Sequence, residues 1–253
     1  NGAAALRIAF SRNHKASIDV LDVSRNEIGV RGAMEFANML GGSHKPFKQL
    51  KLHHNDFGDE GAMALANALA GNRFLESLEL DHSNIEDEGV IALAGALAKN
   101  KCLERLDLAE NKIGDRGAAG LAEMLQSNSV LESLILWYNK DITENGRKAL
   151  CCAMQHNRTL EFLLLPEEYA DCCWAQGVQF FTGCNSLRFW KVMQTENAMI
   201  PWHKAFHVLL TRKEDSFGLW MVFVLLQNRP DILEVASRAC HSDEVARKRR
   251  RIG

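Results

Sequence analysis

The sequence predicts an α/β solenoid in which short strands and helices alternate, closed by a C-terminal α-helical cap. Three observations carry this prediction. Leucines recur every 28 residues, an Ala- and Leu-rich stretch follows each leucine cluster, and the period is lost at Pro166. A repeat of this length forms one strand–helix unit that cannot bury its apolar face alone, so five or six units stack around a continuous core.

The strand half of the repeat has a fixed register. Leu75, Leu103 and Leu131 are each 28 residues apart, and the most complete copy reads L-x-x-L-x-L-x-x-N-x-I over Leu103–Ile113. As in any short strand, the leucines are expected to point inward and the residues between them outward. The Asn is expected to bond backbone groups of its turn, and stacked Asn side chains would form a ladder.

The copies differ in detail. The first begins at Ile18 and the second at Phe47, after a slightly longer loop. The third copy has Ser83 where the Asn belongs, and the fifth carries one extra residue after its Asn. A sixth copy begins at Leu160 and is interrupted by Pro166.

A helix is expected after each strand. Ala62–Leu69 has apolar residues at spacings of three and four, which indicates an amphipathic helix. A Gly four residues after the Ile, such as Gly117, is expected to open each helix next to a tight connection. Gly2–Asn13 looks like the helical half of one more copy, and the chain starts at Asn1 rather than Met. We therefore expect that the sequence is a fragment whose first residues lie within a repeat.

This pattern resembles the leucine-rich repeats of the ribonuclease-inhibitor type, which also occur in NOD-like receptors and in RanGAP. The resemblance covers residues 2–165. It implies a curved horseshoe with parallel strands inside and helices outside. The expected domains are a leucine-rich repeat array over 1–165, a helical capping module over 166–240 and a basic, flexible tail over 241–253.

The C-terminal third is rich in aromatic residues and fits three to five helices. The candidates are Ser186–Thr195, Trp202–Leu210, Ser216–Gln227 and Asp231–Ala239. A cap over the open end of the solenoid explains this composition, and a separate function for the module is the alternative. The tail ends in a basic run that predicts a nuclear-import signal, a contact with an acidic partner, or only a solvated terminus: Arg247, Lys248, Arg249, Arg250 and Arg251.

Composition excludes several protein classes. The chain is 47% hydrophobic and 25% charged, which excludes collagen-like, mucin-like and wholly disordered chains. A net charge of −2 argues against a dedicated nucleic-acid binder. The longest apolar run, Gly218–Leu226, is too short to span a membrane. The seven cysteines include vicinal pairs and suggest reduced thiols, so we expect a cytoplasmic or nuclear location.

The outward strand positions form the candidate partner-binding face, because the resemblance places them on the concave side. Copies three and four contribute carboxylates: Glu76, Glu79, Asp81, Glu104, Asp107 and Glu110. Copy five contributes Ile135, Trp137 and Tyr138, with Phe162 and Leu164 beside them. Parallel strands lie about 4.8 Å apart, so the carboxylates are expected to crowd, and a basic partner would relieve them. Trp and Tyr beside a charged field are typical of a binding hot spot.

A less specific interpretation also fits this face. The carboxylates would then only keep the surface soluble, and the C-terminal cap would cover the aromatic residues. Residues 18–165 hold 22 Asp and Glu against 15 Lys and Arg, a net charge of −7. Nucleic acid is therefore expected, if anywhere, at the basic tail.

No metal or catalytic site is predicted. His53, His54, Asp81 and His82 offer imidazole and carboxylate ligands on adjacent strands, but neighbouring outward side chains are expected to diverge, which favours solvated histidines. The sequence has no Walker A, G-x-S-x-G, H-E-x-x-H or dinucleotide motif. Asn157-Arg-Thr159 is a formal glycosylation sequon, although reduced cysteines argue against its use.

The sequence therefore predicts a non-enzymatic protein–protein interaction scaffold, without cofactor or membrane contact, that binds a basic protein on its concave face. One alternative is a GTPase activator resembling RanGAP, although this chain ends basic where such proteins tend to end acidic. Another is the sensor part of a larger NOD-like signalling protein. Ribonuclease inhibition is disfavoured because the very high cysteine content of ribonuclease inhibitor is missing.

Overall fold

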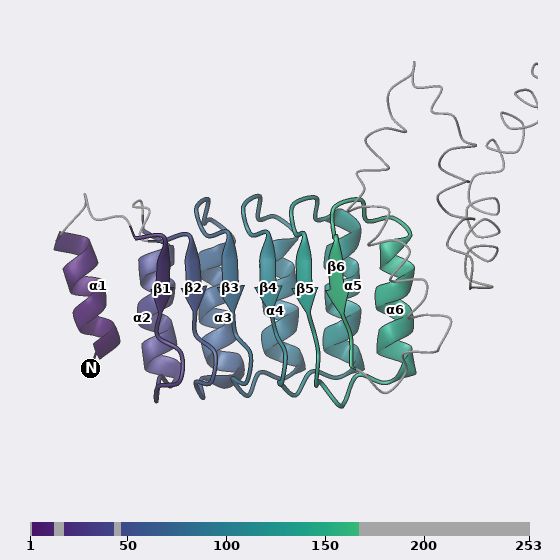
Figure 1. The fold of residues 1–253 in the computed structure, drawn as a ribbon, viewed down its shortest axis with the longest axis horizontal. Helices are drawn as coiled ribbons and strands as arrows, with labels where there is room; N and C mark the ends of the chain where they lie inside the picture. The colour runs from purple at the N-terminus through teal and green to yellow at the C-terminus, as the bar shows by residue number, and fades with distance from the viewer. Residues whose placement is uncertain (1, 13–17, 43–46, 167–253) are drawn as a thin grey trace, which may run out of the picture. The chain divides into compact units, whose positions relative to one another are not determined.

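The computed structural model describes residues 2–12, 18–42 and 47–166, which all lie in one compact unit of the chain, Asn1–Phe189. Helices and strands alternate through these residues (Figure 1). In chain order they are α1 (Gly2–Arg12), β1 (Val20–Asp22), α2 (Val30–Leu40), β2 (Gln49–Lys51), α3 (Gly58–Leu69), β3 (Ser77–Glu79), α4 (Asp87–Leu97), β4 (Arg105–Asp107), α5 (Asp115–Ser127), β5 (Ser133–Ile135), α6 (Glu144–Met154) and β6 (Phe162–Leu164).

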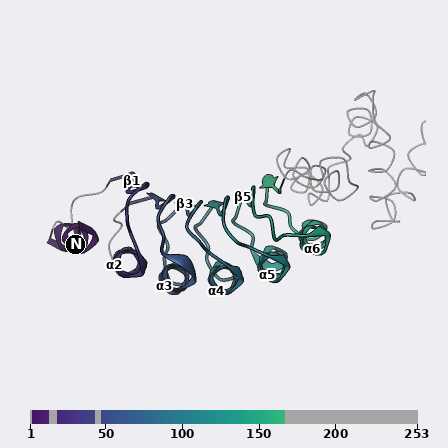
Figure 2. The ribbon, with the colours of Figure 1, turned by 90° about the horizontal axis from the view of Figure 1, so that it is seen from below.

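The strands form one parallel sheet of six, in the order β1-β2-β3-β4-β5-β6. Equivalent residues of successive repeats pair directly, so that Leu50, Leu78 and Leu106 lie in one row across the sheet. The helices form a second layer on one face of this sheet, and their row bows away from the strands (Figure 2). The predicted α/β solenoid is confirmed for the described residues.

The core lies between the two layers and is built from the repeated apolar positions. Leu78, Leu80 and Leu106 are at most 1% exposed, as are the helix residues Leu65 and Leu93. Burying each such side chain contributes roughly 1.5–3 kcal/mol relative to leaving it in water. Because a leucine in one repeat contacts the repeats on both sides, the core is continuous along the array.

A ladder of asparagines ties the turns after the strands together, as the sequence predicted. Asn111 Nδ2 donates to the carbonyl oxygens of Leu80 and Leu108, at 3.0 and 3.1 Å. Its Oδ1 accepts from the backbone N–H groups of Ser83 and Ile85. Asn55 and Asn139 make equivalent bonds in their own repeats. Ser83 is fully buried in the same row, where its Oγ donates to the carbonyl of Asp81.

A second asparagine ladder, which the sequence analysis missed, lies after the helices. Four asparagines, one after each helix from α3 to α6, donate to a carbonyl in the last turn of the helix one repeat earlier and accept two N–H groups of their own turn: Asn72, Asn100, Asn128 and Asn157. Asn157 is 2% exposed, and its Nδ2 donates to the carbonyl of Leu125 at 2.9 Å. The formal glycosylation sequon is therefore a buried structural element.

The repeated glycine has a different role from the one expected. Gly117 is the third residue of α5, so it does not open the helix from outside. A Cβ on Gly117 would lie 2.7 Å from Asp87 Oδ1, the atom that accepts the N–H groups of Gly114 and Gly117 at 2.8 and 2.9 Å. An Asp from one helix thus satisfies the free N–H groups at the start of the next helix, and Gly makes room for it.

Two further predictions concern the described part of the chain, and a third lies outside it. Among the described residues, Cys102, Cys151 and Cys152 form no disulfide bond. Among the described helices, none has the length and apolar character needed to cross a membrane. The capping module over 166–240, its candidate helices and the basic tail fall outside the described residues, except for Pro166.

Candidate functional site

Side chains at alternating strand positions point away from the helices and form the face that we call the strand face. Three rows cross it from β1 towards β6, one beginning at Val20, the next at Asp22 and the third at Ser24. The row that begins at Val20 was missed by the sequence analysis, and it brings Arg105 onto the strand face between the acidic residues. Strict alternation of the strand residues could have identified this row.

The structure divides the six predicted carboxylates into three groups. Glu79, Asp81 and Asp107 lie together on the strand face, because Glu79 and Asp107 pair in register. Glu110 lies at the carboxyl end of its strand, in the turn. Glu76 and Glu104 instead border a separate hollow of about 270 Å³ at the amino ends of the strands, together with Lys48, Arg73 and Lys101.

Lys and Arg side chains of the chain itself pair with three of these six carboxylates. Lys51 Nζ lies 2.9 Å from Glu79 Oε1, and Lys48 Nζ lies 3.0 Å from Glu76 Oε1. Arg105 contacts Glu104 at 3.3 Å. The prediction of crowded, unpaired carboxylates is therefore wrong for these three residues. It considered the acidic residues without the basic residues that lie beside them on the neighbouring strand or at the next position of the chain.

Among the six carboxylates, Asp107 has surroundings that strongly disfavour its charged form. Burial, together with the nearby charges of Asp81 and Glu79, raises its pKa to about 6. The backbone N–H of Ala109 donates to Asp107 Oδ1 at 2.9 Å and opposes this rise. Among the described residues, no Lys or Arg forms an ion pair with Asp107. A cationic group brought to the strand face would therefore stabilise its charged form.

The predicted aromatic and apolar residues form one patch at the end of the described sheet, over β5, β6 and the turn after β5, with Ile135 and Trp137 half-buried in it. Ile135 pairs with Leu164 in register. The rings of Trp137 and Tyr138 are 4.8 Å apart, and Lys140 Nζ lies 4.9 Å from the Tyr138 centroid. Tyr138 is 48%, Phe162 49% and Leu164 38% exposed. We call Ile135, Trp137, Tyr138, Phe162 and Leu164 the aromatic patch.

The histidines converge instead of diverging as expected. The ring centroids of His53 and His54 are 5.6 Å apart, and those of His54 and His82 are 4.4 Å apart. His53 Nδ1 lies 3.8 Å from Asp81 Oδ2. Burial raises the pKa of Asp81, against the opposing charge of His53. His82 lies 3.5 Å from Glu110.

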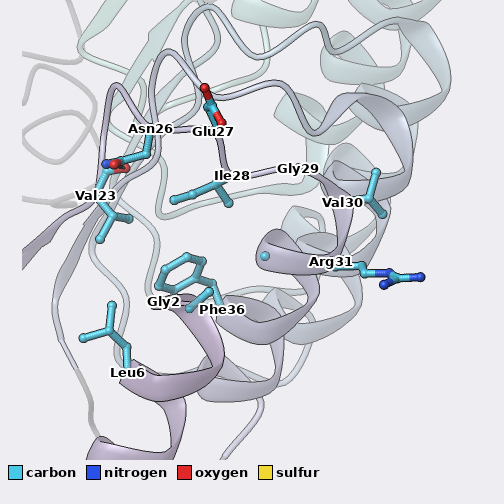
Figure 3. A pocket seen from close by; sticks show the side chains of 12 residues that line it. Gly2, Leu6, Val23, Asn26, Glu27, Ile28, Gly29, Val30, Arg31 and Phe36 are labelled. Atoms are coloured by element: carbon cyan, nitrogen blue, oxygen red, sulfur yellow. Dashed lines mark hydrogen bonds between the residues drawn. The ribbon is translucent and has the colours of Figure 1, made fainter.

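A separate pocket, of about 600 Å³, lies at the other end of the described array, between α1 and the first strand and turn. Leu6, Ile28 and Phe36 line it with apolar side chains, whereas Arg31 extends away from them (Figure 3). It was not predicted from the sequence, because it arises from the packing of α1 against the first repeat. Its lining offers apolar surface but no cluster of reactive groups.

Comparison with known proteins identifies the type of repeat. The family model described as Leucine Rich repeat matches residues 14–37, 44–66, 71–94 and 99–122. A structure titled Leiomodin-1 Actin-Binding Site 2 superposes with a TM-score of 0.55 at 19% identity, covering 63% of this chain and 90% of that chain. The tropomodulin C-terminal domain of Caenorhabditis elegans superposes with a TM-score of 0.53 at 14% identity, covering 64% of this chain and 96% of that chain.

The search of curated proteins found no match. At these identities the two structures establish the fold alone, and the ribonuclease-inhibitor type stays a prediction. The spacing of the matched stretches agrees with the strand–helix units seen in the structure. Four stretches of this chain therefore match leucine-rich repeats, and in the structure these repeats stack into an α/β solenoid.

Proposed function

We propose that this protein is a non-enzymatic scaffold that binds a basic protein partner on its strand face. The observation that carries the proposal is the aromatic patch, which lies exposed on the same sheet as the carboxylates Glu79, Asp81 and Asp107. Exposed aromatic side chains cost free energy in water, and a partner that covers them recovers about 25 cal/mol for each Å² of apolar surface.

The patch has the composition of an energetic centre for binding. Trp and Tyr are over-represented among residues whose truncation weakens interfaces most. The rings of Trp137 and Tyr138 contact each other, which restricts their rotamers. Binding a partner therefore costs less side-chain entropy than it would for two isolated rings. Phe162 and Leu164 extend the same surface from the neighbouring strand.

The charges beside the patch favour a basic partner. Asp107 is half-buried on the strand face without a Lys or Arg ion pair among the described residues. Glu79 is paired with Lys51 at 2.9 Å, so Asp81 and Asp107, which have no Lys or Arg partner among the described residues, supply the remaining negative charge of the strand face. Residual negative charge of this kind steers basic surfaces towards it and speeds association.

The fold itself supports a protein-binding role. One superposing structure carries in its title an actin-binding site, which is a property of leiomodin-1. A solenoid offers a long, continuous strand surface that suits a protein more than a small molecule. The GTPase activator and the sensor part, which the sequence left open, stay predictions, since no contact described above favours either.

Affinity capture from lysate with the full chain tests the proposal when four proteins are compared. They are the parent, an aromatic variant Trp137→Ala/Phe162→Ala, a charge variant Glu79→Gln/Asp107→Asn, and a control Met63→Ala/Glu123→Gln. Met63 and Glu123 are exposed on helices α3 and α5, so the control changes the same kinds of surface on the other layer. Quantitative mass spectrometry identifies what each variant retains.

We expect a basic protein that the parent and the control retain and the aromatic variant loses. The charge variant should bind it more weakly and with a smaller dependence on salt, because fewer charges contribute. Equal capture by all four proteins would contradict the proposed face. If the aromatic variant loses a captured protein that the charge variant retains, the result would support the proposed face and contradict a basic partner.

A further inference from the structure

Two imidazoles and a carboxylate meet on the strand face at the carboxyl ends of β2 and β3. His53, His54 and Asp81 each offer one ligand atom, and these atoms all lie within 4.8 Å of one another. The His53 and Asp81 side chains are only 20% and 22% exposed. Close groups of this kind, partly withdrawn from water, can act together on one ligand.

The backbone explains why two consecutive histidines face the same side. His54 has a φ of 55°, in the left-handed region, which departs from the alternation of an extended strand. The N–H of His54 donates to the carbonyl of Asp81 at 2.9 Å, so the second and third repeats are tied together at this point. The three side chains therefore project from a fixed backbone.

The donor set selects a class of metal ion. Two imidazole nitrogens and one carboxylate oxygen suit Zn²⁺ and similar divalent transition ions, whereas Mg²⁺ and Ca²⁺ prefer oxygen ligands throughout. Zn–N bonds of about 2.0–2.1 Å bring ligand atoms to roughly 3.4 Å from one another. The ligand atoms now lie within 4.8 Å of one another, so side-chain rotations that bring them closer by at most roughly 1.4 Å reach that geometry.

The surroundings favour a cation at this point. Asp107 and Glu79 lie near Asp81 and add negative charge. The His82 ring packs on the His54 ring with centroids 4.4 Å apart, which limits the orientations open to His54. Lys51 contributes an opposing positive charge, but it is paired with Glu79 at 2.9 Å.

We propose that His53, His54 and Asp81 bind a divalent transition-metal ion of the zinc type. Three protein ligands leave a coordination position open, which water or a donor group from another molecule completes. The site does not depend on the proposed protein partner, since all three ligands belong to this chain. It gives the strand face a function that the sequence did not predict.

Calorimetric titration of Zn²⁺ into the full chain tests this site with no partner present. The variants are His53→Ala/His54→Gly and Asp81→Asn, where Gly is chosen because it adopts the positive φ of residue 54 without strain. We expect one site in the parent and a Kd at least about tenfold weaker in each variant, since each has lost ligands. Circular dichroism verifies that both variants fold.

His156→Ala is the matched control, because His156 is exposed on the surface after α6 and remote in sequence from the site. It should bind Zn²⁺ like the parent. Identical isotherms for the parent and the His53→Ala/His54→Gly variant would overturn the proposal. X-ray absorption at the zinc edge gives a second measurement on the parent alone: a nitrogen and oxygen shell supports the site, and a sulfur shell, from the cysteines, overturns it.

Discussion

At the scale of single residues, Asp107 shows how the stacking of repeats changes the chemistry of a side chain. Its neighbours in the strand row are Glu79 on one side and Ile135 on the other, so it is withdrawn from water without gaining a cation. Its pKa of about 6 lies above the usual value of 3.8. The folded protein therefore binds a proton more tightly than the unfolded chain does.

This shift determines the sign of a pH effect on stability. Between pH of about 4 and 6 the folded state holds more protons than the unfolded state, so the free energy of unfolding falls as the pH rises. Asp107→Asn removes this fall. We expect the variant to match the parent near pH 4 and to exceed it by about 1–3 kcal/mol above pH 7.

Urea denaturation of both proteins at pH 4.5 and 7.5 measures the difference, with the exposed Glu132→Gln as a control that should show no such change. A difference between Asp107→Asn and the parent that is the same at both pH values would contradict the shift.

At the scale of elements, glycines that look alike in sequence have opposite expected effects. Gly95 lies in the last turn of α4 with nothing within 4 Å of a Cβ placed on it, so Gly95→Ala should stabilise the protein by about 0.5–1 kcal/mol. At Gly117 the same Cβ would meet Asp87 Oδ1 at 2.7 Å and Ile113 Cγ2 at 2.8 Å. Gly117→Ala should therefore destabilise the protein by about 1–3 kcal/mol, through loss of the Asp87 hydrogen bonds.

Thermal unfolding of the two single variants beside the parent checks this pair. Shifts of Tm in the same direction would show that helix propensity alone governs both positions. Opposite shifts, with a lower Tm for Gly117→Ala, would show that the repeated glycine is needed for the contact between successive helices.

The sequence predicted most of the elements because the repeat period is a local signal. The strands around Leu78 and Leu106, and the ladder through Asn111, follow directly from that period. The second ladder, through Asn100 and Asn128, was missed although its residues also recur every 28 positions, because it lies outside the leucine motif that defined the register.

The strand face was harder to predict because it depends on contacts between repeats. The six carboxylates could be named from their positions, but their division into groups depends on which side of the strand each occupies. Glu76 precedes β3 and borders a different hollow from Glu79 within it. The convergence of His53 and His54 depends on a left-handed φ that alternation does not reveal. Ion pairs such as Lys51–Glu79 join residues 28 positions apart.

At the scale of the whole molecule, stability should vary along the array, because each repeat contacts only its neighbours. Helix α4 packs between α3 and α5, and six of its eleven residues are buried. Helix α1 packs on α2, with Ala3 as its buried residue and Arg7 paired with Glu35. Little apolar surface thus holds α1, whereas α4 opens only when its neighbours on both sides are disrupted.

We therefore expect the backbone amides of α4 to exchange with deuterium at least about tenfold more slowly than those of α1, because local opening costs more free energy in the middle of the array. Hydrogen exchange followed by mass spectrometry measures both helices in one sample. Leu106→Ala in β4 should then accelerate exchange in the repeats on both of its sides and leave α1 nearly unchanged. Equal protection of α1 and α4, lost together in Leu106→Ala, would instead show that the repeats unfold as one cooperative unit.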